Sequence, residues 1–267
     1  MVKRIPLDNV CAKKISTLSS QYDGLIDYVD ISSVDNAEKR IVSTQCVSAK
    51  EAPSRAKQLL EVGDILVSTV RPNLNAVAMV EQQTDNLLVG STGYCVLRCS
   101  DIVDKRYVFY FCQSPYFVDD MTSQATGASY PAVSSGIVKS STIPHHPIEV
   151  QKQIADRLDK VSELIALRKE QLEKLDQLVK SRFIELFGDP VYNNNGLPTK
   201  KLHELGSLDR GRSQYRPRND PKLLNGPYPL IQTGEVASAG LYITEYKNTY
   251  SELDYSKVKC GRRELFV

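Results

Sequence analysis

The most regular hydrophobic pattern of the chain lies in its middle, where apolar or long-stemmed side chains recur in alternating steps of four and three residues. This spacing is the seven-residue repeat of a coiled-coil seam. No Gly or Pro occurs between Gln151 and Phe187, and Gly188-Asp189-Pro190 ends the pattern. The pattern therefore predicts one helix about 55 Å long. Its seam contains Ile154, Leu158, Val161, Ile165, Arg168, Leu172, Leu175, Val179, Arg182 and Leu186.

A single helix of this length cannot bury its own seam, so it requires a partner helix from this chain or from another copy. Arg168 and Arg182 lie on the seam, where a buried unpaired charge would be costly, and they are positions where pairing could be specified. We expect helix pairing through the apolar seam positions Ile154, Leu158, Val161, Ile165, Leu172, Leu175 and Val179.

The residues before this helix alternate between short strand patterns and turn signals. They predict a mixed α+β domain with a half-barrel-like sheet. The expected strands are Leu25–Ile31, Gly63–Val70, Asn75–Val80 and Gly93–Arg98, and Lys105–Cys112 is expected to form a short helix.

Two segments that follow the helix resemble segments near the start of the chain. Leu197–Leu205 is similar to Val2–Val10, and Tyr228–Gly234 is similar to Asp27–Ser33, in the same order. This weak internal repeat predicts three parts: a first domain at 1–147, a long helix at 148–190 and a second, incomplete domain at 191–267.

Composition places the 267 residues among soluble globular proteins, with 41% hydrophobic and 25% charged residues. No apolar run is long enough to span a bilayer, and the N-terminus does not resemble a secretory signal, so we expect a cytoplasmic protein without membrane contact. The six cysteines show no metal-ligand spacing, which favours buried free thiols. The net charge of +2 conceals a basic segment, because residues 191–267 carry 12 Lys and Arg against 8 Asp and Glu.

The motifs that could indicate catalysis are incomplete. The stretch from Gly206 to Ser213 departs from a phosphate-binding loop by having Arg212 in place of Lys, and the prolines that follow prevent the required helix. Asp189-Pro190-Val191-Tyr192 differs by one residue from an adenine methyltransferase motif, but it follows a helix rather than a strand. No hydrolytic triad or metal cluster is recognisable, so we expect a non-enzymatic chain without a cofactor or metal.

Several longer segments carry a family resemblance. They occur in the family's order and resemble the specificity (S) subunit of type I restriction–modification systems: GLIDYVDISSVDN (24–36), APSRAKQ (52–58), VGDILVSTVRPNLN (62–75), STGYCVLR (91–98), TGASYPAVS (126–134), IPHHPIEVQKQIADRLDKV (143–161) and SRFIELFGDP (181–190).

The resemblance implies two target-recognition domains, each reading one half of a split DNA site, joined by antiparallel helices that dock methyltransferase (M) subunits. It further implies a separate restriction (R) subunit for cleavage. The second domain looks truncated here, so two copies could instead pair their helices as a homodimer. The alternative is a coiled-coil adaptor, or a silent or phase-variable fragment, that binds M subunits but no DNA.

Double-stranded DNA would be read by loop side chains, since Arg pairs with guanine and Asn with adenine. The first candidates are Arg71, Asn73 and Asn75, in a Pro-containing turn after a strand, and Tyr130 in a Gly/Pro-shaped loop. Phosphate contacts are expected from basic residues elsewhere in the first domain and in the basic segment. These are Arg55, Lys57, Lys139, Arg210, Arg212, Arg216 and Arg218.

Overall fold

The computed structural model describes residues 3–206 and 220–252. The chain divides into two compact units, Met1–Val179 and Lys180–Val267. The first unit contains a mixed α and β domain, here called the head (residues 3–147), and most of the long helix. The expected three-part division, with a boundary at each end of the helix, stays a prediction.

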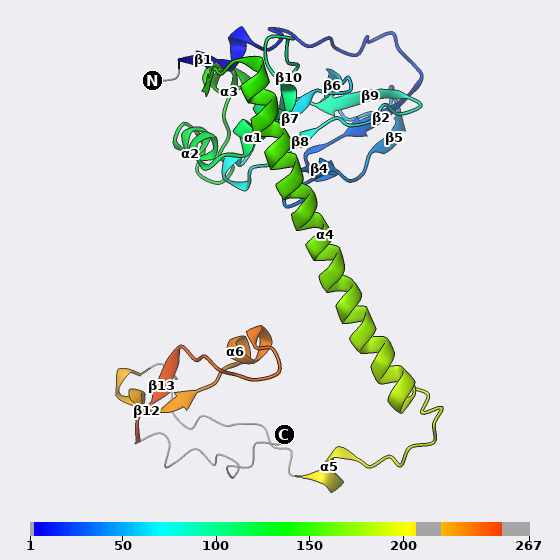
Figure 1. The fold of residues 1–267 in the computed structure, drawn as a ribbon, viewed down its shortest axis with the longest axis vertical. Coiled ribbons are helices and arrows are strands. Elements are labelled where there is room, and N and C mark those ends of the chain that lie inside the picture. The colour runs from blue at the N-terminus through cyan, green and yellow to red at the C-terminus, as the bar shows by residue number, and fades with distance from the viewer. Residues whose placement is uncertain (1–2, 207–219, 253–267) are drawn as a thin grey trace. The chain divides into compact units, whose positions relative to one another are not determined.

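Two sheets form the centre of the head (Figure 1). Most neighbouring strands are antiparallel, while β2–β9 and β4–β8 are parallel. The five-stranded sheet has the order β10 (Tyr94–Leu97), β7 (Ile65–Ser68), β8 (Val77–Met79), β4 (Arg40–Ile41), β3 (Val34–Asp35). The four-stranded sheet has the order β5 (Gln45–Ser48), β2 (Leu25–Val29), β9 (Leu87–Ser91), β6 (Ala56–Leu59).

Short helices cover the five-stranded sheet, and side-chain caps define where they begin. Asp104 accepts hydrogen bonds from two backbone N–H groups at the start of α1, and Ser114 and Ser134 each accept one at the starts of the next two helices. The helices are α1 (Lys105–Gln113), α2 (Pro115–Ser123) and α3 (Ser135–Ser140), with single 3₁₀ turns η1 (Leu7–Asn9), η2 (Ile31–Ser33) and η3 (Pro72–Leu74).

The main core lies between this sheet and the helices. All four residues of β7 and of β10 are buried, so these strands have the continuous apolar character of strands covered on both faces. Cys112 and Phe117 of the helices pack into the same cluster. The α+β class expected from the sequence is confirmed, and each expected strand contains a shorter observed strand. Gly63, the first residue of the expected strand Gly63–Val70, lies before β7 and has a φ of +96°, a backbone conformation that only glycine adopts without strain.

The long helix α4 extends over Ile148–Phe187, as the heptad pattern predicts. Gly188 follows it with a φ of +79° and donates its N–H to the Ile184 carbonyl at 2.8 Å. This is the left-handed glycine ending that stops many helices. Within the part of the chain that the structure covers, no helix has the length and apolar character required to cross a membrane.

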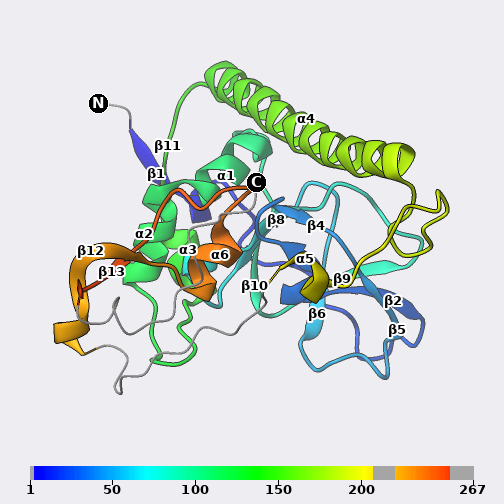
Figure 2. The ribbon, with the colours of Figure 1, turned by 90° about the horizontal axis from the view of Figure 1, so that it is seen from below.

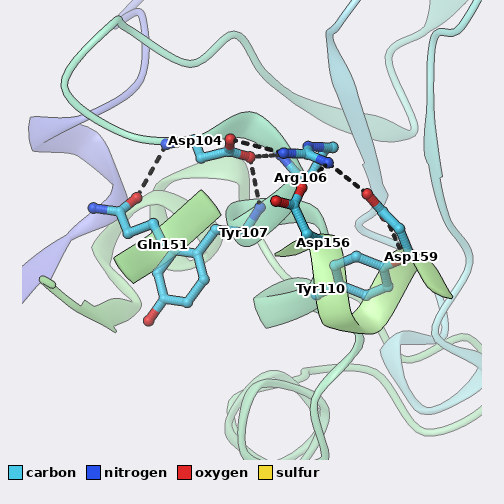
Figure 3. A network of polar contacts seen from close by, with 7 residues as sticks. All are labelled: Asp104, Arg106, Tyr107, Tyr110, Gln151, Asp156 and Asp159. Atoms are coloured by element: carbon cyan, nitrogen blue, oxygen red, sulfur yellow. Dashed lines mark hydrogen bonds and ion pairs between the residues drawn. The ribbon is translucent and has the colours of Figure 1, made fainter. Parts of the chain in front are cut away.

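The first turns of α4 are fixed to the head by polar contacts (Figure 3). The Gln151 side chain is fully buried; it accepts a hydrogen bond from the Asp104 N–H at 3.0 Å and donates one to the His146 carbonyl at 2.7 Å. Arg106 reaches Asp156 at 2.8 Å and Asp159 at 2.6 Å. We call this set the helix-base network: Asp104, Arg106, Tyr110, Gln151, Asp156 and Asp159.

Further along, the helix contacts the head through polar side chains, among them Ser162, which lies 3.3 Å from the Tyr110 hydroxyl. Figure 1 shows α4 running past β4, and Lys169 forms an ion pair of 3.2 Å with Glu38, just before that strand. Three residues with such contacts, Asp159, Ser162 and Lys169, define a polar line along the helix. The apolar seam lies about a quarter turn around the helix from this line, at about 100° per residue.

The seam is therefore exposed over most of its length. Val161, Ile165, Leu172, Leu175 and Val179 are each between 51% and 70% exposed. Ile154 is the exception among the expected pairing residues, because it packs against the head's own core. The sequence pattern did not show this, since the heptad repeat continues without a break from the docked turns into the free part of the helix.

In the second unit, the described residues form a small antiparallel pair of strands with short helices. Strand β12 pairs with β13, with a register shift between Leu224 and Tyr228. The elements are α5 (Leu202–Leu205), η4 (Pro221–Leu223), β12 (Leu224–Leu230), α6 (Thr233–Ser238) and β13 (Asn248–Tyr250). In the first unit, strands β1 (Arg4–Pro6) and β11 (Thr142–Pro144) form a comparable two-stranded sheet that leads into α4, also visible in Figure 2.

The helix-base network yields a stability prediction. Replacing Gln151 by Ala leaves the Asp104 N–H and the His146 carbonyl without their partner in a buried place, so we expect a loss of about 2–4 kcal/mol in unfolding free energy. Denaturant unfolding followed by circular dichroism measures this loss. Gln153→Ala, an exposed position on the same turn, is the matched control and should change stability by less than about 0.5 kcal/mol. Equal effects of the two variants would contradict the role given to Gln151.

Candidate nucleic-acid interface

Two loops that are distant in sequence lie against each other at one end of β7. The Arg71 N–H donates to the Pro131 carbonyl at 2.7 Å, and the Val133 N–H donates to the Thr69 carbonyl at 2.8 Å. Val70 and Ala132 form a bridge between these bonds. The 69–75 loop and the 126–133 loop, both expected from the sequence to carry DNA-reading residues, are thus held together by backbone hydrogen bonds.

Two of the expected residues meet directly across this junction. The guanidinium carbon of Arg71 lies 4.6 Å from the centre of the Tyr130 ring, within the range of a cation–π contact. Tyr130 is 57% exposed and the Arg71 side chain is also exposed. The pair therefore presents a positive charge and an aromatic face at the surface.

The 69–75 loop contains strained backbone. Arg71 has a φ of +48° and Asn75 a φ of +47°, and these two residues flank the turn η3. Non-glycine residues in the left-handed region are uncommon, and such strain is concentrated at functional sites. The strained turn brings Asn73 and Leu74 to the exposed tip of the loop.

Two of the expected DNA contacts, Asn75 for base reading and Lys139 for phosphate, instead form hydrogen bonds within the head. The Asn75 amide donates to the Gln113 carbonyl at 3.3 Å, and the Lys139 ammonium donates to the Ala12 and Lys13 carbonyls at 2.8 Å each. Both side chains are therefore engaged in holding loops, and we do not carry them forward as DNA contacts.

Arg55 is connected to the same region through the turn between β9 and β10. The Thr92 N–H donates to the Arg55 carbonyl, and the Thr69 N–H and hydroxyl donate to the Gly93 carbonyl, all at 2.8–2.9 Å. Arg55 and the 69–75 loop thus lie on the two sides of one turn. Lys57 follows on β6, with an exposed side chain.

The basic side chains of the head fall into two groups. The Arg98 guanidinium binds both carboxylate oxygens of the buried Asp64 at 2.8 Å, and these hydrogen bonds raise the pKa of Arg98. Arg106 is similarly engaged in the helix-base network. In contrast, none of the ion pairs within the described residues involves Arg55, Lys57 or Arg71. These three charges are available for phosphates.

Sequence analysis missed three residues of this surface. Lys39 donates to the Asn75 carbonyl at 2.6 Å, and its burial lowers the pKa of its ammonium group. Leu74 and Thr92 are exposed beside the candidates. No local signal marks Lys39, which is 36 residues from its partner, whereas Leu74 could have been found as an apolar residue inside a polar turn.

Four further candidates lie outside the described residues: Arg210, Arg212, Arg216 and Arg218. Among the residues that are described, no group of three or more His, Cys, Asp or Glu side chains is placed to hold a metal ion. The surface that is visible offers charge, amide and aromatic groups, which suit binding to a polyanion.

Comparison with known proteins agrees with this surface chemistry. The family model described as "Type I restriction modification DNA specificity domain" matches residues 7–177, which is more than half of the chain. The chain belongs to this family of type I restriction–modification specificity subunits.

Two curated relatives carry specificity-subunit names. The MjaVIII specificity subunit of Methanocaldococcus jannaschii is 25% identical over 126 residues, which cover 46% of this chain and 29% of that protein. The HindI specificity subunit of Haemophilus influenzae is 24% identical over 165 residues, covering 60% of this chain and 36% of that protein. The matched regions thus span about a third of each relative.

Solved structures show the same similarity. The HsdS subunit of Thermoanaerobacter tengcongensis matches with a TM-score of 0.55 and 29% identity, over 74% of this chain and 51% of that one. A chain from a study of complex assembly and conformational transition in the type I R-M system matches with a TM-score of 0.58 and 28% identity, with the same coverage.

The contact between Arg71 and Tyr130 can be measured without DNA. We expect a double-mutant cycle of Arg71→Ala and Tyr130→Ala, followed by thermal unfolding, to give a coupling energy of about 0.5–1 kcal/mol. Tyr130→Phe keeps the ring and should retain most of this coupling. Strict additivity of the two alanine substitutions would show that the ring does not hold the arginine.

Proposed function

We propose that this chain is a DNA-recognition and scaffolding subunit of a type I restriction–modification complex, without catalytic activity of its own. The observation that carries the proposal is the joined loop surface, where Arg71, Asn73 and Tyr130 are exposed and Arg55 lies across one turn. Base edges would be read by the planar groups of Arg71 and Asn73. Arg55 and Lys57 would contact phosphates and set the register on the duplex.

In this proposal the head reads one half of a split double-stranded site. Methylation of adenine is carried out by M subunits and cleavage by an R subunit, both separate chains. Support comes from the family match and from α4, which extends beyond the head with its apolar seam exposed. The rival function is an adaptor that binds M subunits through this helix and makes no DNA contact.

A DNA-binding experiment separates the two functions. Methylome sequencing of a host with and without the gene first identifies the target motif. Gel shifts with M subunits over a salt series then compare Arg71→Ala with the unaltered chain on that motif. We expect about a tenfold weaker affinity for the motif in the variant, since one bidentate base contact contributes about 1–3 kcal/mol.

Lys105→Ala is the control, because Lys105 is exposed and its side chain lies beside Gly63, at the opposite end of β7 from the 69–75 loop. It removes one positive charge and should leave the affinity nearly unchanged. The adaptor would be favoured if the chain retards DNA no more than M subunits alone do, or if the retardation is the same for DNA with and without the motif.

We further propose that two copies pair their α4 helices in antiparallel orientation, giving a symmetric dimer that reads a palindromic split site. The exposed seam supports this pairing. An open apolar pocket of about 300 Å³ continues the seam onto the head, and Ile154 and Leu158 line it together with Tyr110 and Phe111.

A charge on the seam should prevent the pairing. Val161 is 51% exposed in one copy, so Val161→Asp has little effect on the folded head but would place a carboxylate in the buried interface. We expect a dimer for the unaltered chain and a monomer for this variant in sedimentation velocity at micromolar concentration. Gln153→Asp, an exposed position off the seam, is the control. A monomeric unaltered chain, both alone and with M subunits, would refute the dimer.

A further inference from the structure

Two cysteines that are far apart in sequence face each other at the edge of the head core. Cys11 and Cys99 form an isolated antiparallel bridge, and their Sγ atoms lie 3.9 Å apart. Hydrogen bonds of 2.8 Å join the residues that flank this pair: Ala12 N to Arg98 O, and Ser100 N to Val10 O. This arrangement makes the cysteines a non-hydrogen-bonded pair of an antiparallel ladder.

The backbone at such a position is already suited to a disulfide. Residues of a non-hydrogen-bonded pair have Cα atoms about 4.5 Å apart, and disulfides connect Cα atoms at about 4.4–6.8 Å. The sulfurs must approach from 3.9 Å to about 2.05 Å. Side-chain rotation can supply this movement while the two chain segments stay in place.

The environment of the pair distinguishes the two sulfurs. A hydrogen bond from the Cys99 thiol lowers the pKa of Cys11, and the nearby charge of Lys139 acts in the same direction. The pKa of Cys99 is raised, first by its hydrogen bond to Cys11 and then by burial. Cys11 therefore has the greater thiolate character, and nucleophilic attack by sulfur proceeds through the thiolate.

Other cysteines lack this combination. Burial raises the pKa of Cys95 to about 11 and that of Cys112 well above its ordinary value. Cys46 is exposed, against the expectation of buried thiols throughout, and its sulfur accepts a hydrogen bond from the Asn86 amide at 3.6 Å rather than facing a thiol. Within the described chain, Cys11 and Cys99 are the cysteines whose sulfurs are in direct contact.

We propose that Cys11 and Cys99 are a modification site that forms a reversible intramolecular disulfide on exposure to a small peroxide. The Cys11 thiolate attacks one oxygen of hydrogen peroxide, the O–O bond breaks, and the departing hydroxide takes a proton to leave water and a sulfenic acid. The Cys99 thiol then loses its proton and attacks this sulfur, and a second water leaves. The two thiols lose two electrons, and the peroxide gains them.

Cys99 is partly exposed while Cys11 is 7% exposed, so a reagent of nearly the size of water is the appropriate oxidant. The bond would join segments 88 residues apart. Cys11 lies just after η1, which follows β1. Strand β1 pairs with β11, the strand that leads into α4. The disulfide would thus fix the base of the long helix to β10. This inference does not depend on the proposed function.

The experiment uses the full chain treated with hydrogen peroxide and then analysed by intact mass and by non-reducing peptide mapping. We expect each chain to lose about 2 Da, the mass of two hydrogens. We also expect a peptide containing the Cys11–Cys99 link, and full reversal by dithiothreitol. The oxidised form should unfold about 5–10 °C higher, since closing a long loop restricts the unfolded chain.

Matched variants identify the sulfurs. Cys46→Ser together with Cys260→Ser should oxidise as the unaltered chain does, which excludes a link through either of these cysteines, and an intact mass of one chain excludes an intermolecular link. Cys11→Ser and Cys99→Ser should each abolish the mass loss, and circular dichroism verifies that they fold. Oxygen addition at Cys11 without a link, or a link through Cys112, in the unaltered chain would overturn the proposal regardless of how the variants behave.

Discussion

The attachment of α4 to the head depends on a small buried polar contact at the base of the helix. Gln151 has no exposed surface and bridges a backbone N–H of one segment and a carbonyl of another, while Arg106 pairs with two carboxylates of the next turns. Buried polar groups are costly unless they are bonded, so this geometry permits one docking of the helix. That docking turns the head-facing line of α4 inward and leaves the apolar seam exposed.

The same principle separates structural from available charges on the head. Arg98 and Arg106 are bound by carboxylates, and Lys139 by two backbone carbonyls, so these cations are neutralised or satisfied inside the protein. Arg71 contacts a ring rather than a carboxylate and keeps its charge accessible. The loop that carries it is strained at both ends, and backbone bonds to the 126–133 loop offset that strain.

Local patterns predicted the regular elements well. The predicted helix at 148–190 starts at the same residue as α4 and ends three residues beyond it, because a period of 3.5 over several turns is unlike any strand pattern. Each expected strand was found in shortened form, since turn residues such as Gly63 end them. The candidate site was predicted in part. Arg71 and Tyr130 were named separately, but no sequence pattern indicated that they touch, or that Asn75 and Lys139 point to internal carbonyls.

The amino-acid sequence by itself determined the helices and strands of this protein, the apolar seam of the helix and the chemical types of side chain on its loops. These follow from periodicity and residue chemistry over short distances. The tertiary structure alone decided which cations remain free, which face of α4 is covered, and which cysteines meet. Each of these depends on contacts between segments tens of residues apart, such as Lys39 with Asn75 or Cys11 with Cys99. Local propensity has no information about such pairings.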